Sequence, residues 1–409
     1  MPERATVVRS TVVGGGAALL FGFGVHHHRL DWASALLLVA MVALSFLLKA
    51  APAPGPATDV ERSRVRAMVG RQGADTLAPF ALRSDKSYLF SSDGSAALGY
   101  RVLLGVAVVG GDPVGEPAAF ADVVGRFHAL CWRRGWRPAV LGARGDLVDL
   151  WTAYGMRPVG IGDEVVLDVV PFGLGTRRMR NVRQAVRRTH NAGIRTEVMT
   201  ANELSGEVRA EMAELSHRWL GTRRERGFAM ILDGLVDDRH PTGLFVLAFE
   251  PAGQLVGFQR YLPCGQDTAL SLDVMRRDRD RLNGLNERMI VDVVEYARAN
   301  GIGQVSLNFA AFRSLLDRGD SRTRVQQAGY RLIHLLDPLI QVESLYLFNA
   351  KFRPGYVPRS VVVDSWFGLP AALFAFLGLE FALPYDRHRH ATPSEVENAQ
   401  SELYRTRLS

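Results

Sequence analysis

The sequence predicts an α+β protein that contains two modules of similar design. Two observations support this prediction. First, one order of elements occurs twice along the 409 residues: a helix, a group of short apolar runs separated by turns, a second helix and a strand. Second, a composition of 47% hydrophobic and 22% charged residues is typical of a globular chain with a large core, and the length suffices for two ordinary domains.

The first module is expected at residues 69–175. Its apolar runs are broken at Asp93-Gly94 and at Gly110-Gly111, which is typical of antiparallel strands joined by tight turns. The expected elements are a helix over 60–73, a meander over 87–116, a helix over 117–135 and a strand over 137–143.

The second module, expected at residues 194–364, repeats this order. A hairpin is predicted to turn at Ala252-Gly253. The expected elements are a helix over 201–220, the hairpin over 243–263, a strand over 268–278, a helix over 285–301 and a strand over 304–310. Two such modules in succession are the layout of a tandem acyltransferase of the GNAT type. Because folds of this kind support several chemistries, function has to be argued from the site.

A basic helix is predicted between the modules, at residues 176–193. The segment TRRMRNVRQAVRRTHNAG contains six arginines and no acidic residue. Helical spacing places one group of side chains on a docked face: Met179, Val182, Ala185 and Val186. It places the cations on the opposite face: Arg177, Arg180, Arg183, Arg187 and Arg188. Since uncompensated guanidinium groups repel one another, we expect a polyanionic partner, either RNA or an anionic phospholipid surface.

The N-terminal 50 residues are expected to form a two-helix membrane anchor. They contain two apolar runs, at 10–25 and 33–49, with arginines or lysines beyond both outer ends. By the positive-inside tendency both ends face the cytoplasm, which predicts a cell-membrane protein whose catalytic part is cytoplasmic. A proline-rich linker follows at 51–68.

The C-terminal region, 365–409, is expected to contain an apolar helix and a mobile tail. The run at 365–385 is rich in phenylalanine and leucine and has Trp366 and Tyr385 at its ends. Two interpretations stay open at this stage. One is a helix buried against the core, and the other is a helix that lies in the membrane interface.

Two stretches of the second module carry polar groups in apolar surroundings. Asp273 lies in the middle of an expected strand, where an acid is disfavoured unless it has a specific role, either in a structural Asp–Arg ion pair or in a site. The stretch 342–359 contains several charged and amide residues among aromatics, and its prolines predict a fixed loop: Glu343, Asn349, Lys351, Arg353 and Arg359.

These stretches resemble a known family. LDVMRRD (272–278), SLNFAAF (306–312) and above all ESLYLFNAKFRPGYVPR (343–359) resemble the C-terminal synthase domain of the bacterial phosphatidylglycerol lysyltransferases, also called aminoacyl-phosphatidylglycerol synthases. DKSYLFSSDG (85–94) and the basic helix are similar to the same family. The resemblance covers roughly residues 70–365. It implies a tandem GNAT fold and transfer of an aminoacyl group from aminoacyl-tRNA to the glycerol hydroxyl of phosphatidylglycerol at an anionic membrane surface.

The resemblance also implies roles for individual residues. Asp273 and Arg276 are expected in the active site, with Asp273 either as a base or as the receptor of the amino acid's ammonium group. Lys351 and Arg359 are expected to hold a phosphate. Asn308, Glu343, Lys86 and Ser91 are further substrate-binding candidates, and for each of these four a structural hydrogen bond is an equal alternative. The sequence specifies neither the amino acid that is transferred nor the oligomeric state.

No cofactor or metal is expected. An aminoacyl ester is already activated, so the protein has mainly to orient the lipid hydroxyl and accept a proton. Cys131 and Cys264 lie far apart in sequence, which disfavours a disulfide framework or a cysteine metal site.

Three other functions remain as alternatives. An acetyl-CoA-dependent N-acetyltransferase needs a small residue at the end of a glycine-rich phosphate turn, and RLNGLN (281–286) has Asn286 there. A peptidoglycan-precursor aminoacyltransferase would share the fold and the tRNA donor. A membrane-tethered lipid- or RNA-binding protein without activity would keep only the fold.

Overall fold

The computed structural model describes residues 51, 53–71, 75–221, 232, 235, 242–278, 282–311 and 347–379. The predicted N-terminal hairpin, Glu343 and the tail from residue 380 lie outside these residues. Within them, no helix has the length and apolar character needed to cross a bilayer.

The first half of the chain forms the elements that its turns and periodicity predict, with two more. Its helices are α3 (Asp59–Arg71), α4 (Phe120–Arg134) and α5 (Val148–Thr152), and its strands are β1 (Ser87–Phe90), β2 (Ala96–Leu103), β3 (Val106–Gly110), β4 (Val114–Gly115), β5 (Arg137–Arg144) and β6 (Arg157–Asp168). Short 3-10 helices lie at Ala78–Leu82, Pro117–Ala119 and Gly145–Leu147. Helix α5 and strand β6 were not expected from the sequence.

The second half begins with the basic helix. Its helices are α6 (Arg180–Asn191), extended by a 3-10 turn at Arg177–Met179, then α7 (Gly206–Leu220), α8 (Leu285–Ala299) and α12 (Leu369–Leu377). Its strands are β7 (Arg195–Thr200), β8 (Leu244–Phe249), β9 (Leu255–Cys264), β10 (Ala269–Arg277), β11 (Gln304–Ala311) and β12 (Gly355–Val363). Two short 3-10 helices lie at Ala201–Glu203 and Trp366–Gly368. The predicted hairpin is confirmed, with Gly253 in the left-handed region at φ 89° in its turn.

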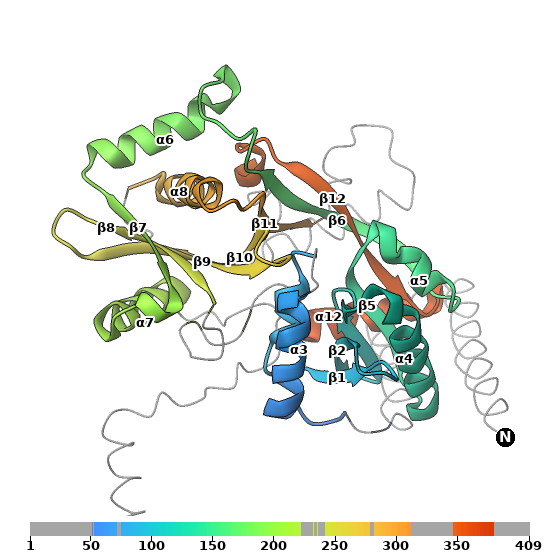
Figure 1. Ribbon diagram of the computed structural model, residues 1–409. Coiled ribbons are helices and arrows are strands. Elements are labelled where there is room, and N and C mark those ends of the chain that lie inside the picture. The colour runs from blue at the N-terminus through green and yellow to red at the C-terminus, as the bar shows by residue number, and fades with distance from the viewer. Residues whose placement is uncertain are drawn as a thin grey trace, which may run out of the picture.

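One twelve-stranded mixed sheet runs through both halves (Figure 1). Its strand order is β1-β2-β3-β5-β12-β6-β11-β10-β9-β8-β7, and β4 pairs with β2 beside this path. Among the described strands, β3 pairs with β5 in parallel, β10 pairs with β11 in parallel, and all other pairs are antiparallel. Each parallel pair follows an antiparallel meander and is connected through a helix, α4 or α8. The two halves therefore repeat one order of elements: an antiparallel meander, a helix and a parallel strand.

The last strands of the two halves are exchanged. Strand β6 ends the first half but pairs with β11 of the second, and β12 ends the second half but pairs with β5 of the first. The two exchanged strands also pair with each other. Backbone hydrogen bonds thus join the halves, and the sheet does not divide at the basic connecting segment. The stretch around Pro358, expected as a loop, was wrongly assigned from Gly355 onwards, because these residues form β12.

Helices cover both faces of the sheet (Figure 1). In the first half, alternation along β3 sends Ala107 and Val109 towards α4 and Val106 and Val108 towards α12. In the second half, α6 and α8 pack on one face and α7 on the other. A further apolar cluster joins the halves, since Leu262 of β9 packs with residues of α3 and of the 3-10 helix at Ala78–Leu82.

Candidate active site where β10 and β11 separate

Strands β10 and β11 separate after a short parallel contact. They pair only from Ala269 to Ser271 on β10 and from Gln304 to Ser306 on β11. Beyond this point both strands are irregular: the register of β10 against β9 shifts between Leu272 and Val274, and the register of β11 against β6 shifts between Ser306 and Phe309. Bulges at one level turn the two strands apart at their carboxyl ends, which is where α/β sheets bind ligands.

Asp273 lies in the bulge of β10, and its side chain is completely buried. One carboxylate oxygen accepts a hydrogen bond from Nε of Arg260 on β9, whose side chain is 2% exposed. The other oxygen accepts the backbone N–H of Leu232 at 2.9 Å, and Nη1 of Arg260 donates to the carbonyl of Leu235 at 2.8 Å. The sequence left a structural Asp–Arg ion pair open for Asp273. The structure contains such a pair, and Arg260 is the partner.

Asn308 holds the two separated strands at a fixed distance. It has φ 72°, a left-handed conformation that asparagine tolerates better than most residues. Its Nδ2 donates to the carbonyl of Leu272 at 3.1 Å, directly before Asp273, and its backbone N–H donates to Oγ of Ser306 at 3.1 Å. A local conformation that costs free energy is typical of functional sites. The predicted candidates Asn308 and Asp273 are thus brought together.

Arg276 lies three residues beyond Asp273 on β10 and contacts an aromatic ring. Its residue is 5% exposed, and its guanidinium carbon lies 4.0 Å from the ring centroid of Trp219, at the end of α7. Stacking of this kind fixes the planar guanidinium without using all of its donors. Trp219 was not singled out from the sequence.

Arg359 lies in a buried cluster of carboxylates where the exchanged strands meet. Its guanidinium pairs with Glu164 on β6, with Asp75 and, at 3.7 Å, with Asp112; the side chains of Arg359 and Glu164 are each 1% exposed. Burial alone would lower the pKa of Arg359, but the charges of Asp75 and Glu164 raise it above its ordinary value. These contacts account for the guanidinium without a phosphate, so the structure gives no support to the expected phosphate role of Arg359.

The carboxylate cluster is connected to the separated strands. Oε1 of Glu164 accepts hydrogen bonds from the hydroxyls of Thr76 and Ser306, the latter at 2.5 Å. Burial, together with the negative charge of Asp75, raises the pKa of Asp112 to about 7. Contacts therefore lead from Arg359 through Glu164 and Ser306 to Asn308.

The cationic face of α6 is exposed as predicted. Met179, Val182 and Ala185 are buried and Val186 is partly buried, whereas the predicted cations are exposed: Arg177, Arg180, Arg183, Arg187 and Arg188. Within the described residues none of these five pairs with a carboxylate. Arg183 and Arg188 donate to backbone carbonyls: Arg183 to Thr176 at 3.1 Å and to Leu174, and Arg188 to Asn283 at 3.1 Å.

Lys351 lies beside this face. Its ammonium group pairs with Glu287 at 2.9 Å and lies 5.0 Å from the ring centroid of Phe348. A cavity of about 300 Å³ is lined by residues of α6, by Glu287 of α8 and by Lys351; the residues of α6 are Asn181, Gln184, Ala185 and Arg188. Two cations that the sequence proposed separately, Lys351 and Arg188, therefore line one cavity.

The turn before α8 is closed by α6. Gly284 precedes the helix with φ 109°, and a Cβ on it would lie only 3.1 Å from Cβ and 3.3 Å from Cα of Ala185. The backbone N–H groups of a helix start can bind a phosphate only if the phosphate reaches them. Here the body of another helix occupies that approach.

Lys86 and Ser91 hold the first half together and lie outside this site. Lys86 is fully buried and donates to the carbonyl of Phe80 at 2.9 Å. Ser91 donates to Asp93 at 2.6 Å and accepts the N–H of Ala96 at 2.9 Å, which stabilises the turn between β1 and β2. For both, the structural alternative agrees with these contacts.

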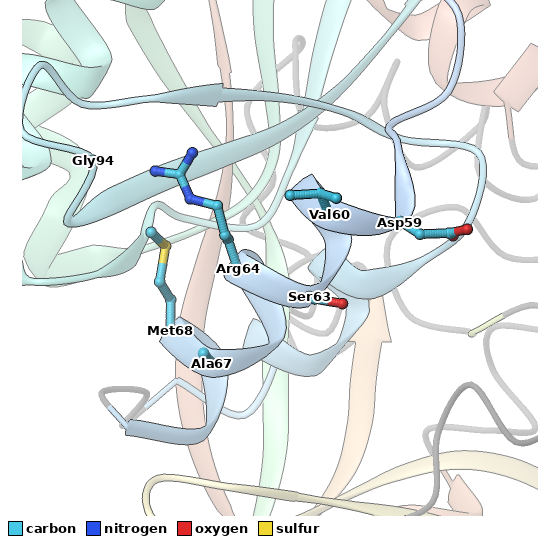
Figure 2. Close-up of a pocket in the computed structure, with 7 residues that line it drawn as sticks. All are labelled: Asp59, Val60, Ser63, Arg64, Ala67, Met68 and Gly94. Atoms are coloured by element: carbon cyan, nitrogen blue, oxygen red, sulfur yellow. The ribbon is translucent and has the colours of Figure 1, made fainter.

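A second hollow lies along α3, in the first half. It has a volume of about 600 Å³, and its lining residues are Asp59, Val60, Ser63, Arg64, Ala67, Met68 and Gly94. Figure 2 shows Arg64 and Met68 pointing towards the turn at Gly94, with Asp59 directed away from them. The guanidinium of Arg64 is stacked on Phe90 at 4.3 Å. None of the predicted site residues lines this hollow.

Comparison with known proteins identifies the family. The family model described as phosphatidylglycerol lysyltransferase, C-terminal, matches residues 66–363, which include both halves of the sheet. The chain belongs to this family. An MprF-like domain protein of Mycobacterium tuberculosis is 41% identical over 331 residues, which are 80% of this chain and 68% of that protein. The lysylphosphatidylglycerol biosynthesis bifunctional protein LysX of Gordonia bronchialis is 34% identical over 374 residues, 89% of this chain but 33% of LysX.

Solved structures agree with the fold of this phosphatidylglycerol lysyltransferase family member. The C-terminal domain of a putative lysylphosphatidylglycerol synthetase from Agrobacterium fabrum has a TM-score of 0.69 at 22% identity, covering 80% of this chain and 98% of that one. L-PGS from Bacillus licheniformis has a TM-score of 0.68 at 19% identity, covering 78% and 96%. The mixed α+β fold is thereby confirmed.

The sequence patterns identified candidate residues of the site but not the residues that pair with them. Arg260 and Glu164 each interrupt an apolar strand, as Asp273 does. The same argument, that a charged residue in a buried strand needs a partner, could have found both of them. Which charges meet could not be derived in this way, because Arg359 and Glu164 are 195 positions apart.

Proposed function

We propose that this chain transfers an aminoacyl group from an aminoacyl-tRNA to the glycerol hydroxyl of phosphatidylglycerol, at the cytoplasmic face of the cell membrane. Membership of the phosphatidylglycerol lysyltransferase family supports the reaction and the lipid acceptor. The chain spans about a third of the length of the LysX relative, so the activity of that whole protein is carried over here only as part of the proposal.

The observation that supports an RNA as the aminoacyl donor is the exposed guanidinium face of α6. Five arginines on one face without a carboxylate partner among the described residues favour a polyphosphate over a neutral ligand. The adjacent cavity is lined by Lys351, which pairs with Glu287, and by Asn181 and Gln184. The amide side chains of Asn181 and Gln184 could hydrogen bond to the unpaired bases of a single-stranded RNA end.

The reaction is an exchange of esters. The lipid hydroxyl oxygen attacks the ester carbonyl, the new acyl–oxygen bond forms, the bond to the ribose oxygen breaks, and one proton passes from the lipid hydroxyl to the ribose. The protein has to align the two reactants and accept a proton transiently. We place this step where β10 and β11 separate. Asp273 is the candidate for receiving the proton or the ammonium group, because it belongs to the motif that resembles the family and lies in the bulge of β10.

A thioester intermediate on the protein is disfavoured. Burial raises the pKa of Cys131 to about 12 and raises that of Cys264 above its ordinary value. Both thiols are therefore protonated near neutral pH and are poor nucleophiles. Direct transfer between the two substrates requires neither.

The contact between α6 and Gly284 weighs against the acetyl-CoA alternative. In that class of enzyme the pyrophosphate of the donor lies at the start of the helix that corresponds to α8. Here the backbone and side chain of Ala185 lie within 3.3 Å of a Cβ built at Gly284, so a pyrophosphate would have to displace α6. The same helix presents its outer face to solvent, where a larger polyanion has free access.

A reconstituted transfer assay tests the proposal. The full chain is placed in vesicles that contain phosphatidylglycerol, supplied in turn with lysyl-, alanyl-, arginyl- and ornithyl-tRNA, and the lipids are analysed by mass spectrometry. We expect one new lipid whose mass equals phosphatidylglycerol plus one aminoacyl group. Arg187→Glu should lower its rate of formation, whereas Arg126→Glu, an exposed position on α4, should not. Unaltered lipid with all four donors, or transfer from acetyl-CoA instead, would refute the proposal.

A further inference from the structure

Helix α12 has one buried and one exposed apolar face. Ala372, Ala375 and Phe376 pack on β3, β5 and β12 in the core of the first half. Three aromatic side chains at the start and on the outer face of the same helix are exposed to water: Trp366 at 61%, Phe367 at 92% and Phe374 at 56%. The sequence left open whether this run is buried or lies at a membrane interface. Within the described residues, one side of α12 is suited to the protein core and the other to a membrane interface.

The start of α12 is fixed to the start of β5 and to the turn between β2 and β3. Arg137 pairs with Asp364 at 3.4 Å. Nη1 of Arg137 also lies 3.1 Å from the position that a Cβ on Gly368 would take. The backbone N–H of Arg137 donates to the carbonyl of Gly105 at 2.8 Å. Leu104, next to Gly105, is 42% exposed. These three segments therefore form one corner of the molecule.

The end of α4 belongs to the same corner. It carries Trp132, which is 53% exposed, and the exposed cations Arg133 and Arg134; it is followed directly by β5. The aromatic corner is accordingly defined by Leu104, Trp132, Arg133, Arg134, Trp366 and Phe367. Of the ten large hydrophobic side chains exposed in the described residues, four are in this set.

Ala51 ties the N-terminal sequence to the aromatic corner. Its N–H donates to the carbonyl of Arg134 at 3.1 Å, and its carbonyl accepts Nε1 of Trp136 at 2.8 Å. The apolar sequence run 33–49 ends two residues earlier. The chain thus enters the described structure directly beside the exposed aromatics.

We propose that the aromatic corner docks on the headgroup layer of an anionic phospholipid bilayer. Tryptophan and phenylalanine are favoured at that depth, and arginines beside them are attracted to anionic headgroups. A second copy of the chain fits less well. A two-fold symmetric contact would bring Arg133 and Arg134 of both copies together, and neither makes an ion pair with a carboxylate in the described residues.

In this docking the anionic bilayer and the RNA contact different parts of the molecule. Figure 1 shows α6 over the second half of the sheet and α4 and α12 over the first half. The bilayer would lie against the first half, which leaves the cationic face of α6 open to RNA. The inference rests on the proposed function only for the choice of phosphatidylglycerol as the anionic lipid.

Nitroxide accessibility tests the docking without any turnover. Phe367→Cys in the full chain is spin-labelled and reconstituted in vesicles of phosphatidylcholine with phosphatidylglycerol. A label at Val170→Cys, a site that is 84% exposed between β6 and α6, serves as the matched control. Cys131 and Cys264 are buried, and the unsubstituted chain measures their background labelling. Collisions with oxygen and with a water-soluble nickel complex are then compared at the two positions.

In the vesicles we expect the ratio of oxygen to nickel accessibility to be severalfold higher at residue 367 than at residue 170. In detergent-free nanodiscs that lack anionic lipid we expect this ratio to be equal at the two residues. Equal ratios in the phosphatidylglycerol vesicles would overturn the docking. So would spin–spin broadening at residue 367, because that result indicates contact between two copies. Neither outcome depends on aminoacyl transfer, so a failure of the proposed function is recognised separately in the transfer assay.

Discussion

Arginine has opposite surroundings in two regions of this molecule. On α6, five exposed arginines have no carboxylate partner among the described residues, and two of them, Arg183 and Arg188, donate to backbone carbonyls. Where the exchanged strands meet, the single guanidinium of Arg359 is buried among three carboxylates. The first arrangement leaves charge available to a ligand, and the second uses charge to hold strands together. Burial and the nearest acids, rather than residue type, decide which function an arginine serves.

The largest effect is expected for Arg359. Arg359→Met removes the cation and leaves Asp75, Asp112 and Glu164 buried beside one another. Loss of one partner of a buried ion pair typically lowers the free energy of unfolding by about 3–5 kcal/mol. Urea denaturation measures the loss. Arg187→Met on α6 is the matched control and should change stability by less than about 0.5 kcal/mol. Equal losses of stability at the two positions would show that the buried Arg359 and the exposed Arg187 do not differ in their contribution to folding.

A similar loss is expected at the second buried pair. Asp273→Leu or Arg260→Leu alone leaves a buried charge without its main partner and should cost about 3–5 kcal/mol, whereas the double substitution should cost clearly less than the sum. A double-mutant cycle by chemical denaturation checks this. Additive losses would show that the two side chains do not interact. Because either single change perturbs folding, activity of Asp273 variants is informative only beside a measured unfolding transition.

The carboxylate cluster should also make stability depend on pH. Burial and the charge of Asp75 raise the pKa of Asp112 from its ordinary 3.8 to about 7. Between these values the unfolded chain has lost this proton and the folded chain has kept it. The free energy of unfolding therefore falls as pH rises from about 4 to about 7, by on the order of a few kcal/mol, and then levels off. Denaturation curves across this range should show a smaller fall for Asp112→Asn.

The smallest effect is expected on α6, in binding rather than in stability. Arg187→Glu should weaken tRNA binding roughly tenfold and make the dependence of affinity on salt less steep by about one phosphate contact. The unfolding transition should stay unchanged. Binding titrations at several salt concentrations measure both quantities, with Arg126→Glu as control. If Arg187→Glu shifts the unfolding transition but not the binding curve, α6 is structural like the Arg359 cluster.

Much of the fold was predictable because its signals are local. The helices at 60–73, 117–135 and 285–301 and the hairpin turn at Gly253 follow from spacing and turn residues within a few positions. Strands β6 and β12 were missed because they carry charges and prolines that usually mark loops. Pro358 lies opposite Asp163 inside the sheet, where the exchange of strands and not local preference determines the structure.

The candidate site divides in the same way. Sequence patterns singled out Asp273, Asn308 and Lys351 as candidates, since each lies in a recognisable motif. They did not predict that Asp273 pairs with Arg260 or that Lys351 and Arg188 line one cavity. The structure gives no support to the predicted phosphate role of Arg359, because its guanidinium pairs with three carboxylates. These carboxylates come from three other segments, so no local pattern connects them with Arg359.

The sequence alone determined the periodic helices, the turns and the cationic face of α6, because neighbouring residues fix these through backbone geometry and side-chain spacing. Only the tertiary structure decided which charges are available to a substrate. The guanidinium of Arg359 is neutralised by residues up to 284 positions away, and no local pattern encodes a contact over that distance. The cost of burying an unpaired charge makes these partners obligatory, while water screens the exposed arginines of α6 and leaves them free of such a constraint.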